Sequence, residues 1–364
     1  MRITPTRRFF VQSIIAGLSF GPAVLRAESR SDLSVLQRWS TGNSRLNPLS
    51  EAGGELLFCG DKTVGAISLA SREPLWIKAH GFDNPAEFRP RPSGALMICG
   101  GRHWIAAFDA VSGAEIWRYV AEIQTGVPLV TPTHTLFGDG HRLVALDTAT
   151  GAKRWHFAGV PDTLASYAPA ATADTVFIGP GDGRLYALAL ADGALKWSVD
   201  GRKQWQYLRQ ITVEGDTIIA GTYKENLTGL AVADGKKLWS FNAGNFINSQ
   251  HVANGTAYLW SPTGWVYAIN TGSGKVRWRY QTTDYDGTAT NWASVLAELQ
   301  TLDEYLYVLS MDNVLHRLDI AGGTEHLEMR VPDRIRHALL PIADHGIAFP
   351  TEGAEILLTS FPES

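Results

Sequence analysis

Cysteine and charge are both scarce in this 364-residue chain, which has two cysteines and 19% charged residues. So few cysteines exclude a small domain stapled by disulfides. An apolar fraction of 45% excludes a disordered chain, and 36 glycines, far fewer than one residue in three, exclude collagen. The length would allow two domains at about 150 residues each, or one large β architecture.

Long apolar runs are also missing. Residues 11–25 form a mild apolar stretch that includes Pro22, but it is shorter than the roughly 20 residues that a bilayer needs, and no later segment is long enough either. Arg7 and Arg8 precede this stretch, and Ala27 stands at a small-residue cleavage position. We therefore expect residues 1–27 to be a twin-arginine export signal. The rest, residues 28–364, is then a periplasmic protein with no membrane span and no cysteine at the cut for a lipid anchor.

Basic residues do not outnumber acidic ones. Removal of the leader takes away four arginines and moves the formal net charge from −4 to −8. An acidic chain disfavours nucleic acid or an anionic membrane as the main partner. Local catalytic and metal motifs are absent as well: the sequence has no His-x-x-x-His, no Cys-x-x-Cys-His and no local Ser-His-Asp signature. We expect no metal site.

What the sequence does contain is a repeat. One unit recurs in which a short β run, a turn and a second β run are followed by a glycine four residues before a tryptophan, as in Gly151 and Trp155. The anchors of the unit are Trp39, Trp76, Trp117, Trp155, Trp197, Trp239, Trp278 and, in a degenerate copy, Leu327. A period near 40 residues with several β runs per unit is typical of a propeller blade of four short antiparallel strands.

The two ends of the chain set the number of blades. The segment around Trp39 looks like the outer strand of a blade, but the inner strands of that blade do not precede it in the sequence. Residues 346–349 and 355–361, near the other end, form β runs with no tryptophan strand after them. We infer that residues 33–41 complete the last blade and close a ring of eight blades. Seven of the twelve tryptophans are then structural, each burying roughly 150–250 Å² between blades. The predicted fold is all-β, and a single ring of eight blades accounts for the chain without a second domain. We expect the protein to be a monomer.

The repeat resembles a known family. Residues 267–278, which read Tyr-Ala-Ile-Asn-Thr-Gly-Ser-Gly-Lys-Val-Arg-Trp, resemble the repeat of the pyrroloquinoline quinone (PQQ)-like eight-bladed propellers. That family includes PQQ-dependent dehydrogenases and the non-catalytic propeller subunit of the outer-membrane protein assembly machinery. The resemblance implies the fold, but the fold alone does not choose between these activities.

In propellers the ligand end is the central funnel, which is lined by residues between the tryptophan strand of one blade and the first strand of the next. Polar and aromatic residues gather in those segments. The candidates for ligand binding are Arg45, Arg89, Trp205, Tyr207, Arg209, Asn248, Asn291, Trp292 and Arg336. Several arginines around one funnel of an acidic protein favour an anionic ligand or a carboxylate-bearing peptide. The alternative is that these arginines form plain surface ion pairs with Glu87, Glu122 and Asp333.

PQQ with calcium is a second possible occupant, because arginines and a stacking Trp292 or Trp205 suit a flat tricarboxylate. The resemblance argues against it at several points. The chain lacks the adjacent cysteines that PQQ dehydrogenases carry, shows no clear calcium-binding constellation, and has almost no insertions between blades. Cys59 and Cys99 stand at seemingly equivalent places in consecutive blades, so we expect them to point the same way and not to meet.

The sequence therefore favours a non-catalytic periplasmic propeller that binds a protein, a peptide or a small anionic ligand through its funnel and blade edges. A PQQ-type or other oxidoreductase is the alternative. A twin-arginine leader raises that alternative, because this route exports proteins already folded and often with cofactor in place.

Overall fold

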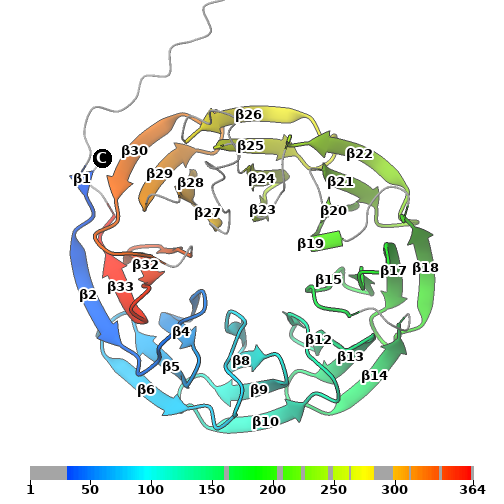
Figure 1. The fold of residues 1–364 in the computed structure, drawn as a ribbon, viewed down its shortest axis with the longest axis horizontal. Coiled ribbons are helices and arrows are strands. Elements are labelled where there is room, and N and C mark those ends of the chain that lie inside the picture. The colour runs from blue at the N-terminus through cyan, green and yellow to red at the C-terminus, as the bar shows by residue number, and fades with distance from the viewer. Residues whose placement is uncertain are drawn as a thin grey trace, which may run out of the picture.

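The computed structural model describes residues 31–159, 164–202, 208–222, 226–244, 249–261, 264–282, 298–310, 313–335 and 338–361. Within these ranges the regular structure is entirely β, and no helix there is long and apolar enough to cross a membrane. The expected leader, residues 1–27, lies outside the described residues. The strands form eight sheets arranged as a ring, with the first strand of each sheet nearest the axis and the fourth at the outside (Figure 1).

Seven of the eight blades follow one another along the chain. Blade 1 consists of β3 (Ser50–Ala52), β4 (Glu55–Cys59), β5 (Thr63–Ser68) and β6 (Pro74–Ala79), and blade 2 of β7 (Arg91–Ser93), β8 (Leu96–Gly101), β9 (Trp104–Asp109) and β10 (Glu115–Val120). Blade 3 consists of β11 (Leu129–Val130), β12 (His134–Asp139), β13 (Arg142–Asp147) and β14 (Lys153–Ala158), and blade 4 of β15 (Ala170–Ala171), β16 (Thr175–Ile178), β17 (Arg184–Ala189) and β18 (Leu195–Asp200). Blade 5 consists of β19 (Leu208–Glu214), β20 (Thr217–Thr222), β21 (Asn226–Ala231) and β22 (Lys237–Asn242), and blade 6 of β23 (Ser249–Ala253), β24 (Thr256–Trp260), β25 (Trp265–Asn270) and β26 (Val276–Gln281). Blade 7 consists of β27 (Leu299–Leu302), β28 (Tyr305–Leu309), β29 (Val314–Asp319) and β30 (Glu325–Arg330).

Blade 8 joins the two ends of the described chain. It consists of β31 (Leu340–Ile342), β32 (Gly346–Pro350), β33 (Glu355–Thr359) and, as its outer strand, β2 (Val35–Ser40). Trp39 of β2 pairs with Ile356 of β33, so the expected closure of the ring is confirmed. The sequence did not predict β1 (Ser31–Asp32), which adds a fifth, parallel strand to the outer edge of β30.

The core is divided among the junctions between blades. Among the described residues, eight hydrophobic clusters lie one between each pair of neighbouring blades; the cluster of blades 3 and 4, for example, contains Leu136, Trp155 and Val176. The middle strands are buried on both faces, as at Leu185–Leu188. Each blade depends on its neighbours because an isolated blade would leave both apolar faces in water.

The seven repeated tryptophans hold the blades together in one way. Each indole Nε1–H donates a hydrogen bond to a backbone carbonyl in the turn of the next blade. The pairs are Trp39 with Arg72, Trp76 with Ala110, Trp117 with Thr148, Trp155 with Leu190, Trp197 with Val232, Trp239 with Thr271 and Trp278 with Ile320, at 2.8–3.2 Å. A small residue lies beside the indole on the neighbouring strand, since Ala145 pairs directly with Trp155 and Gly229 with Trp239.

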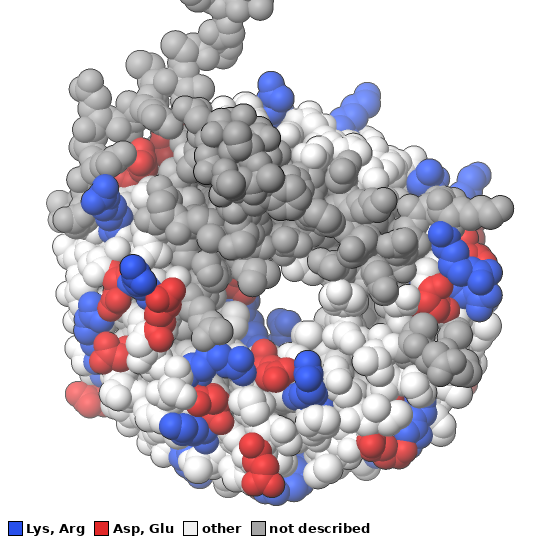
Figure 2. All heavy atoms as spheres, in the orientation of Figure 1, with Lys and Arg blue, Asp and Glu red and all other residues white. Residues whose placement is uncertain are grey.

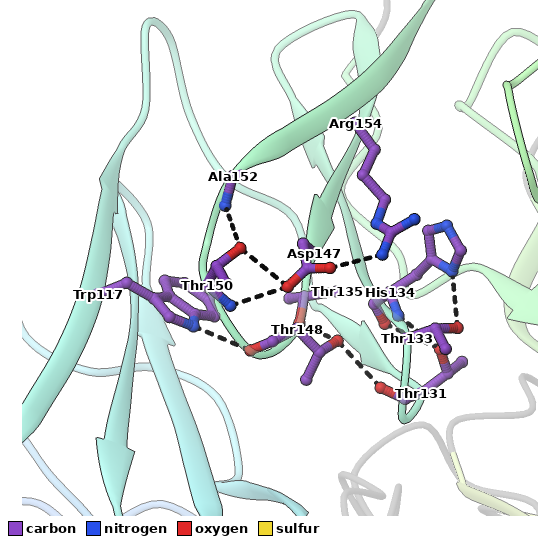
Figure 3. Close-up of polar contacts among 10 residues, drawn as sticks. All are labelled: Trp117, Thr131, Thr133, His134, Thr135, Asp147, Thr148, Thr150, Ala152 and Arg154. Atoms are coloured by element: carbon purple, nitrogen blue, oxygen red, sulfur yellow. Dashed lines mark hydrogen bonds and ion pairs between the residues drawn. The ribbon is translucent and has the colours of Figure 1, made fainter.

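The glycine of the repeat lies under the indole of the preceding blade. In Figure 3 the turn that follows β13 is held by Asp147, whose carboxylate accepts hydrogen bonds from the backbone N–H and the hydroxyl of Thr150, both at 2.9 Å. Gly151 follows at φ +70°, and a Cβ there would lie 2.6 Å from the Trp117 ring. Only glycine meets both demands, so the Asp/Asn-x-x-Ser/Thr-Gly pattern, which recurs at residues 109–113, 147–151 and 270–274, marks a turn that receives a tryptophan.

Candidate functional site

Two of the loops that cross from one blade to the next, before β3 and before β11, are fixed by a half-buried and a buried aspartate. The Asp61 carboxylate accepts the backbone N–H of Arg45 at 3.0 Å, and Asp139 accepts that of Glu122 at 2.9 Å. Burial alone would raise the pKa of both carboxyls, but the hydrogen bonds they accept outweigh it and hold each pKa below its ordinary value. These loops are therefore rigid supports for the side chains at the mouth of the channel.

Arg45 lies at this mouth. Its side chain borders an open hollow of about 340 Å³ that is also lined by Asn47, Pro48 and Glu87. Asn47 fixes the loop by donating a hydrogen bond from Nδ2 to the carbonyl of Ala86 at 2.9 Å. The Nη2 of Arg45 is buried, and no described residue accepts a hydrogen bond from it. The guanidinium, which has no ion pair among the described residues, places a positive charge at the border of the hollow, and this charge suits an anionic group there.

Arg89 forms an ion pair across the channel. It precedes β7 of blade 2 and its Nη2 donates to the carboxylate of Glu298, which precedes β27 of blade 7. The two residues are 209 positions apart, and 20% and 27% of their side-chain surfaces remain exposed. Burial raises the pKa of Glu298, and the positive charges of Arg89 and Arg91 offset that rise only in part. Figure 2 shows basic and acidic side chains together at the rim of the central opening.

A polar wall continues from this pair along blades 5 to 7. Gln250 of β23 donates from Nε2 to the carbonyl of Gln210 at 3.1 Å, and the His251 Nε2 lies 2.9 Å from the Thr301 hydroxyl. Burial, together with the charge of Arg89, lowers the pKa of His251. The imidazole is therefore neutral at pH 7, and this side of the channel offers hydrogen bonds and one bound ion pair.

The opposite wall is mostly apolar. The innermost strands of blades 2 to 5 border a hollow of about 360 Å³ whose lining includes Leu129, Ala170 and Ile211. Arg91 of β7 reaches this hollow, half-buried. Arg91 was not among the candidates predicted from the sequence, although alternate residues of an extended segment face the same side and Arg89 was a candidate.

Of the candidate residues, the structure describes the side chains of Arg45 and Arg89 and places both on the channel face. Arg209 of β19 pairs through its backbone with Gly221 of β20, and its side chain lies outside the described part of the structure. The remaining candidates, Trp205, Tyr207, Asn248, Asn291, Trp292 and Arg336, lie outside the described residues. Those six stay predictions.

The alternative of plain surface ion pairs is partly wrong in its choice of partners. Glu122 pairs with Arg142, and Asp333 pairs with Arg38 at 2.6 Å, and neither acid forms an ion pair with Arg45 or Arg89, the two candidate arginines whose side chains are described. Arg89 does form an ion pair, but with Glu298 across the channel. Within the described ranges no three histidine, cysteine or acidic side chains gather as a metal site.

The expectation that Cys59 and Cys99 point the same way is wrong. Both are free and buried, they share the cluster between blades 1 and 2, and their side chains are in hydrogen-bonding contact. Burial, followed by this contact, raises the pKa of Cys99. The strand registers give the reason: Ala52 pairs with Glu55 and Ser93 with Leu96, which makes Cys59 equivalent to Gly100. A shift of one residue turns a side chain to the opposite face.

The repeats match a family model described as "Outer membrane protein assembly factor BamB" over residues 60–204, 101–245 and 199–302. These segments span more than half of the chain. The chain belongs to this family of PQQ-like propellers. No curated protein sequence matches it.

Solved structures show the same fold at low sequence identity. BamB from Moraxella catarrhalis is 19% identical with a TM-score of 0.69, covering 90% of this chain and 100% of its own. Sqt1 from Chaetomium thermophilum, bound to the N-terminus of the ribosomal protein L10, is 12% identical with a TM-score of 0.71, covering 91% and 100%. The quinohemoprotein alcohol dehydrogenase ADHIIG from Pseudomonas putida HK5 is 11% identical with a TM-score of 0.69, covering 91% and 78%. Identities this low establish the shared propeller fold and no activity.

Proposed function

We propose that this protein is an exported, periplasmic, non-catalytic propeller that binds a partner protein or peptide through its central funnel and the edges of its blades. Its family supports this proposal, since the matching family model describes an assembly factor. Sqt1, a propeller of similar fold, is bound to the N-terminus of another protein in its solved structure. The leader of residues 1–27 supports export, and we propose cleavage after it.

The observation that carries the proposal is the state of Arg45. A guanidinium with a buried, unpaired Nη2 among the described residues lies beside an open hollow of about 340 Å³ at the channel mouth. A partner carboxylate in this hollow would gain a charge-assisted contact with the guanidinium. We therefore infer that the partner presents an acidic side chain or a chain terminus at the channel mouth.

The blade edges offer a second contact. An outer strand leaves one row of backbone N–H and C=O groups unpaired, which is a template for a further strand. The edge of β30 already accepts β1 in parallel, through Ser31 and Asp32. Apolar side chains such as Leu75, Ile116 and Leu238 stay exposed on the outer strands of blades 1, 2 and 5. An extended partner segment fits such an edge.

The test is quantitative co-purification. The tagged full chain, expressed with its own leader, is recovered from the periplasm and its bound proteins are measured by mass spectrometry. Arg45→Glu reverses the charge at the channel mouth, so we expect a loss of the principal partner of roughly tenfold or more. Lys275→Glu makes the same reversal on an exposed turn before β26, at the end of the blade away from the crossing loops, and serves as the matched control.

The proposal is contradicted if Arg45→Glu, folded like the parent chain, retains every partner at the parental level. It is contradicted as well if Lys275→Glu loses the same partner to the same extent. Circular dichroism and the urea unfolding midpoint establish that each variant is folded.

A PQQ-dependent or other oxidoreductase remains the alternative, and the fold shared with a quinohemoprotein alcohol dehydrogenase is what favours it. The described residues do not fit PQQ with calcium, because Glu298 is already bound by Arg89 and no other group of acidic ligands gathers in the described ranges. The absorbance of the periplasmic protein, before and after addition of PQQ and calcium, tests the alternative. Uptake of the cofactor with dye-linked oxidation of alcohols or sugars would establish an enzyme.

A further inference from the structure

Among the described residues, Arg91 has no ion-pair partner of its own. None of the described residues forms an ion pair or a hydrogen bond with its side chain, and its Nε is buried and unpaired. Glu298, whose charge acts on Arg91, already accepts a hydrogen bond from Arg89. Burial lowers the pKa of Arg91, and the charge of Arg89 lowers it further, while Glu298 raises it. An unpaired, partly desolvated guanidinium is costly for the fold, and an anion that paired with it would offset that cost.

The hollow beside Arg91 is apolar on its other sides. It is bordered by Pro128, Leu129, Ala168, Ala170 and Ile211, contributed by blades 3, 4 and 5. Small side chains and two-residue inner strands in blades 3 and 4 create the space. A volume of about 360 Å³ equals the share of roughly twelve waters in the liquid and falls within the usual range of small-molecule sites, about 300–1,000 Å³.

The chemistry of the two sides defines the ligand. A single available guanidinium matches one carboxylate in a bidentate geometry, whereas a phosphate dianion or a tricarboxylate needs further cations that Arg89, bound by Glu298, does not supply. The hydroxyl of Thr212, which also lines the hollow, adds one hydrogen-bonding group. The remaining apolar wall stabilises a hydrocarbon body at about 25 cal/mol per Å² of buried surface.

We propose that this hollow binds a monocarboxylate with an apolar body, the carboxylate on Arg91 and the body against Leu129, Ala170 and Ile211. Two sources carry this chemistry: a free carboxylic acid and the C-terminus of a peptide that ends in an apolar residue. The site is separate from Arg45 and does not depend on the proposed function.

The experiment is calorimetric titration of the purified full chain with hexanoate and with a short peptide that ends in leucine. The matched probes are hexanamide, the same peptide with an amidated C-terminus, and inorganic phosphate. We expect at least one of the two carboxylates to bind roughly 10- to 100-fold more tightly than its neutral counterpart, because the charge-assisted hydrogen bonds are lost with the charge. Tighter binding of hexanoate than of the peptide identifies a free acid as the ligand, and the reverse order identifies a peptide C-terminus.

Variants assign the binding to this hollow. Arg91→Gln is expected to lose roughly 10- to 100-fold of the carboxylate affinity, while Arg277→Gln, the same change on the exposed outer strand β26, leaves it unchanged. Ala168→Phe keeps Arg91 but fills the hollow, and is expected to abolish binding as well. This second variant decides the matter if Arg91→Gln does not fold.

The proposal is overturned if both carboxylates bind no better than their neutral counterparts, if phosphate binds more tightly than either, or if the folded hollow variants bind like the parent chain. None of these results bears on co-purification of a protein partner, so failure here leaves the proposed function standing, and failure of the partner test leaves this site standing.

Discussion

The outer and innermost strands of the blades differ in how far they repeat. Each tryptophan of an outer strand donates to the next blade in the same way, from Trp39 to Trp278. The innermost strands of blades 1 to 7 can be compared at one equivalent position, the residue that pairs with the residue seven positions later in the second strand. That position holds Ser50, Arg91, Leu129, Ala170, Thr212, His251 and Gln300. Their partners are all large and apolar or aromatic. Repetition thus builds the ring, and the innermost strands depart from it.

The comparison predicts that the outer contacts dominate stability. Trp155→Ala removes a buried indole and its hydrogen bond to the Leu190 carbonyl, and is expected to lower the free energy of unfolding by about 3–5 kcal/mol. Trp155→Phe keeps most of the apolar contact and is expected to cost less than half as much. Urea unfolding measures both changes. A loss below about 1 kcal/mol for Trp155→Ala would contradict the structural role of the indole.

The glycine under the indole is the second test of the outer ring. Gly193 has φ +74°, and a Cβ there would lie 2.6 Å from the Trp155 ring. Gly193→Ala is expected to lower the free energy of unfolding by about 2–3 kcal/mol, from backbone strain together with the clash. Gly215, at φ +56° with open space around its Cβ position, is the matched control, and Gly215→Ala is expected to cost about 1 kcal/mol. Equal losses in the two variants would show that the contact with Trp155 contributes nothing.

The ion pair across the channel has a smaller expected effect. Arg89→Gln leaves Glu298 partly buried without its partner and is expected to lower the free energy of unfolding by about 2 kcal/mol, less than for a fully buried pair because both side chains keep some exposure. The double variant Arg89→Gln/Glu298→Gln is expected to recover about half of that loss. A double-mutant cycle by urea unfolding measures the coupling, and strictly additive losses would mean that the two charges do not interact.

The smallest expected effect is the pH dependence of a crossing loop. The hydrogen bonds to Asp139 lower the pKa of its carboxyl, so the stabilisation is present above the unfolded pKa near 3.9 and is lost as pH falls through the folded pKa. Asp139→Asn is expected to lower the free energy of unfolding by about 1 kcal/mol at pH 6 and to reduce its loss between pH 5 and pH 3. Unfolding at several pH values tests this, and identical pH profiles would contradict it.

The ring could be predicted from the sequence because the same local contact recurs. Each indole needs a small cross-strand neighbour and a glycine in the next blade, and Ala145, Trp155 and Gly193 show all three demands in one stretch of chain. The closure of the ring could be predicted because the two ends of the chain each contain one part of the same blade. The C-terminal strands lack an outer strand, and the strand of Trp39 pairs with the strand of Ile356 in that place.

The channel could be predicted only in part, since its contacts join residues far apart in the sequence. Arg89 was identified as a candidate, but nothing local indicates its partner Glu298, on the far side of the ring. Arg91 could be assigned to the wall of the hollow only once the register of β7 with its neighbouring strand was known. The same dependence on register explains Cys59 and Cys99, where an alignment off by one residue reversed the direction of a side chain.

The central claim is that the innermost strands and crossing loops, not the repeated outer ring, carry specific recognition. Hydrogen exchange of the chain with and without its co-purified partner tests it most directly. The account predicts that peptides covering residues 44–49 and 86–91 gain protection when the partner is bound. Protection confined to outer strands such as β6 and β10, with no change at residues 44–49 and 86–91, would contradict it.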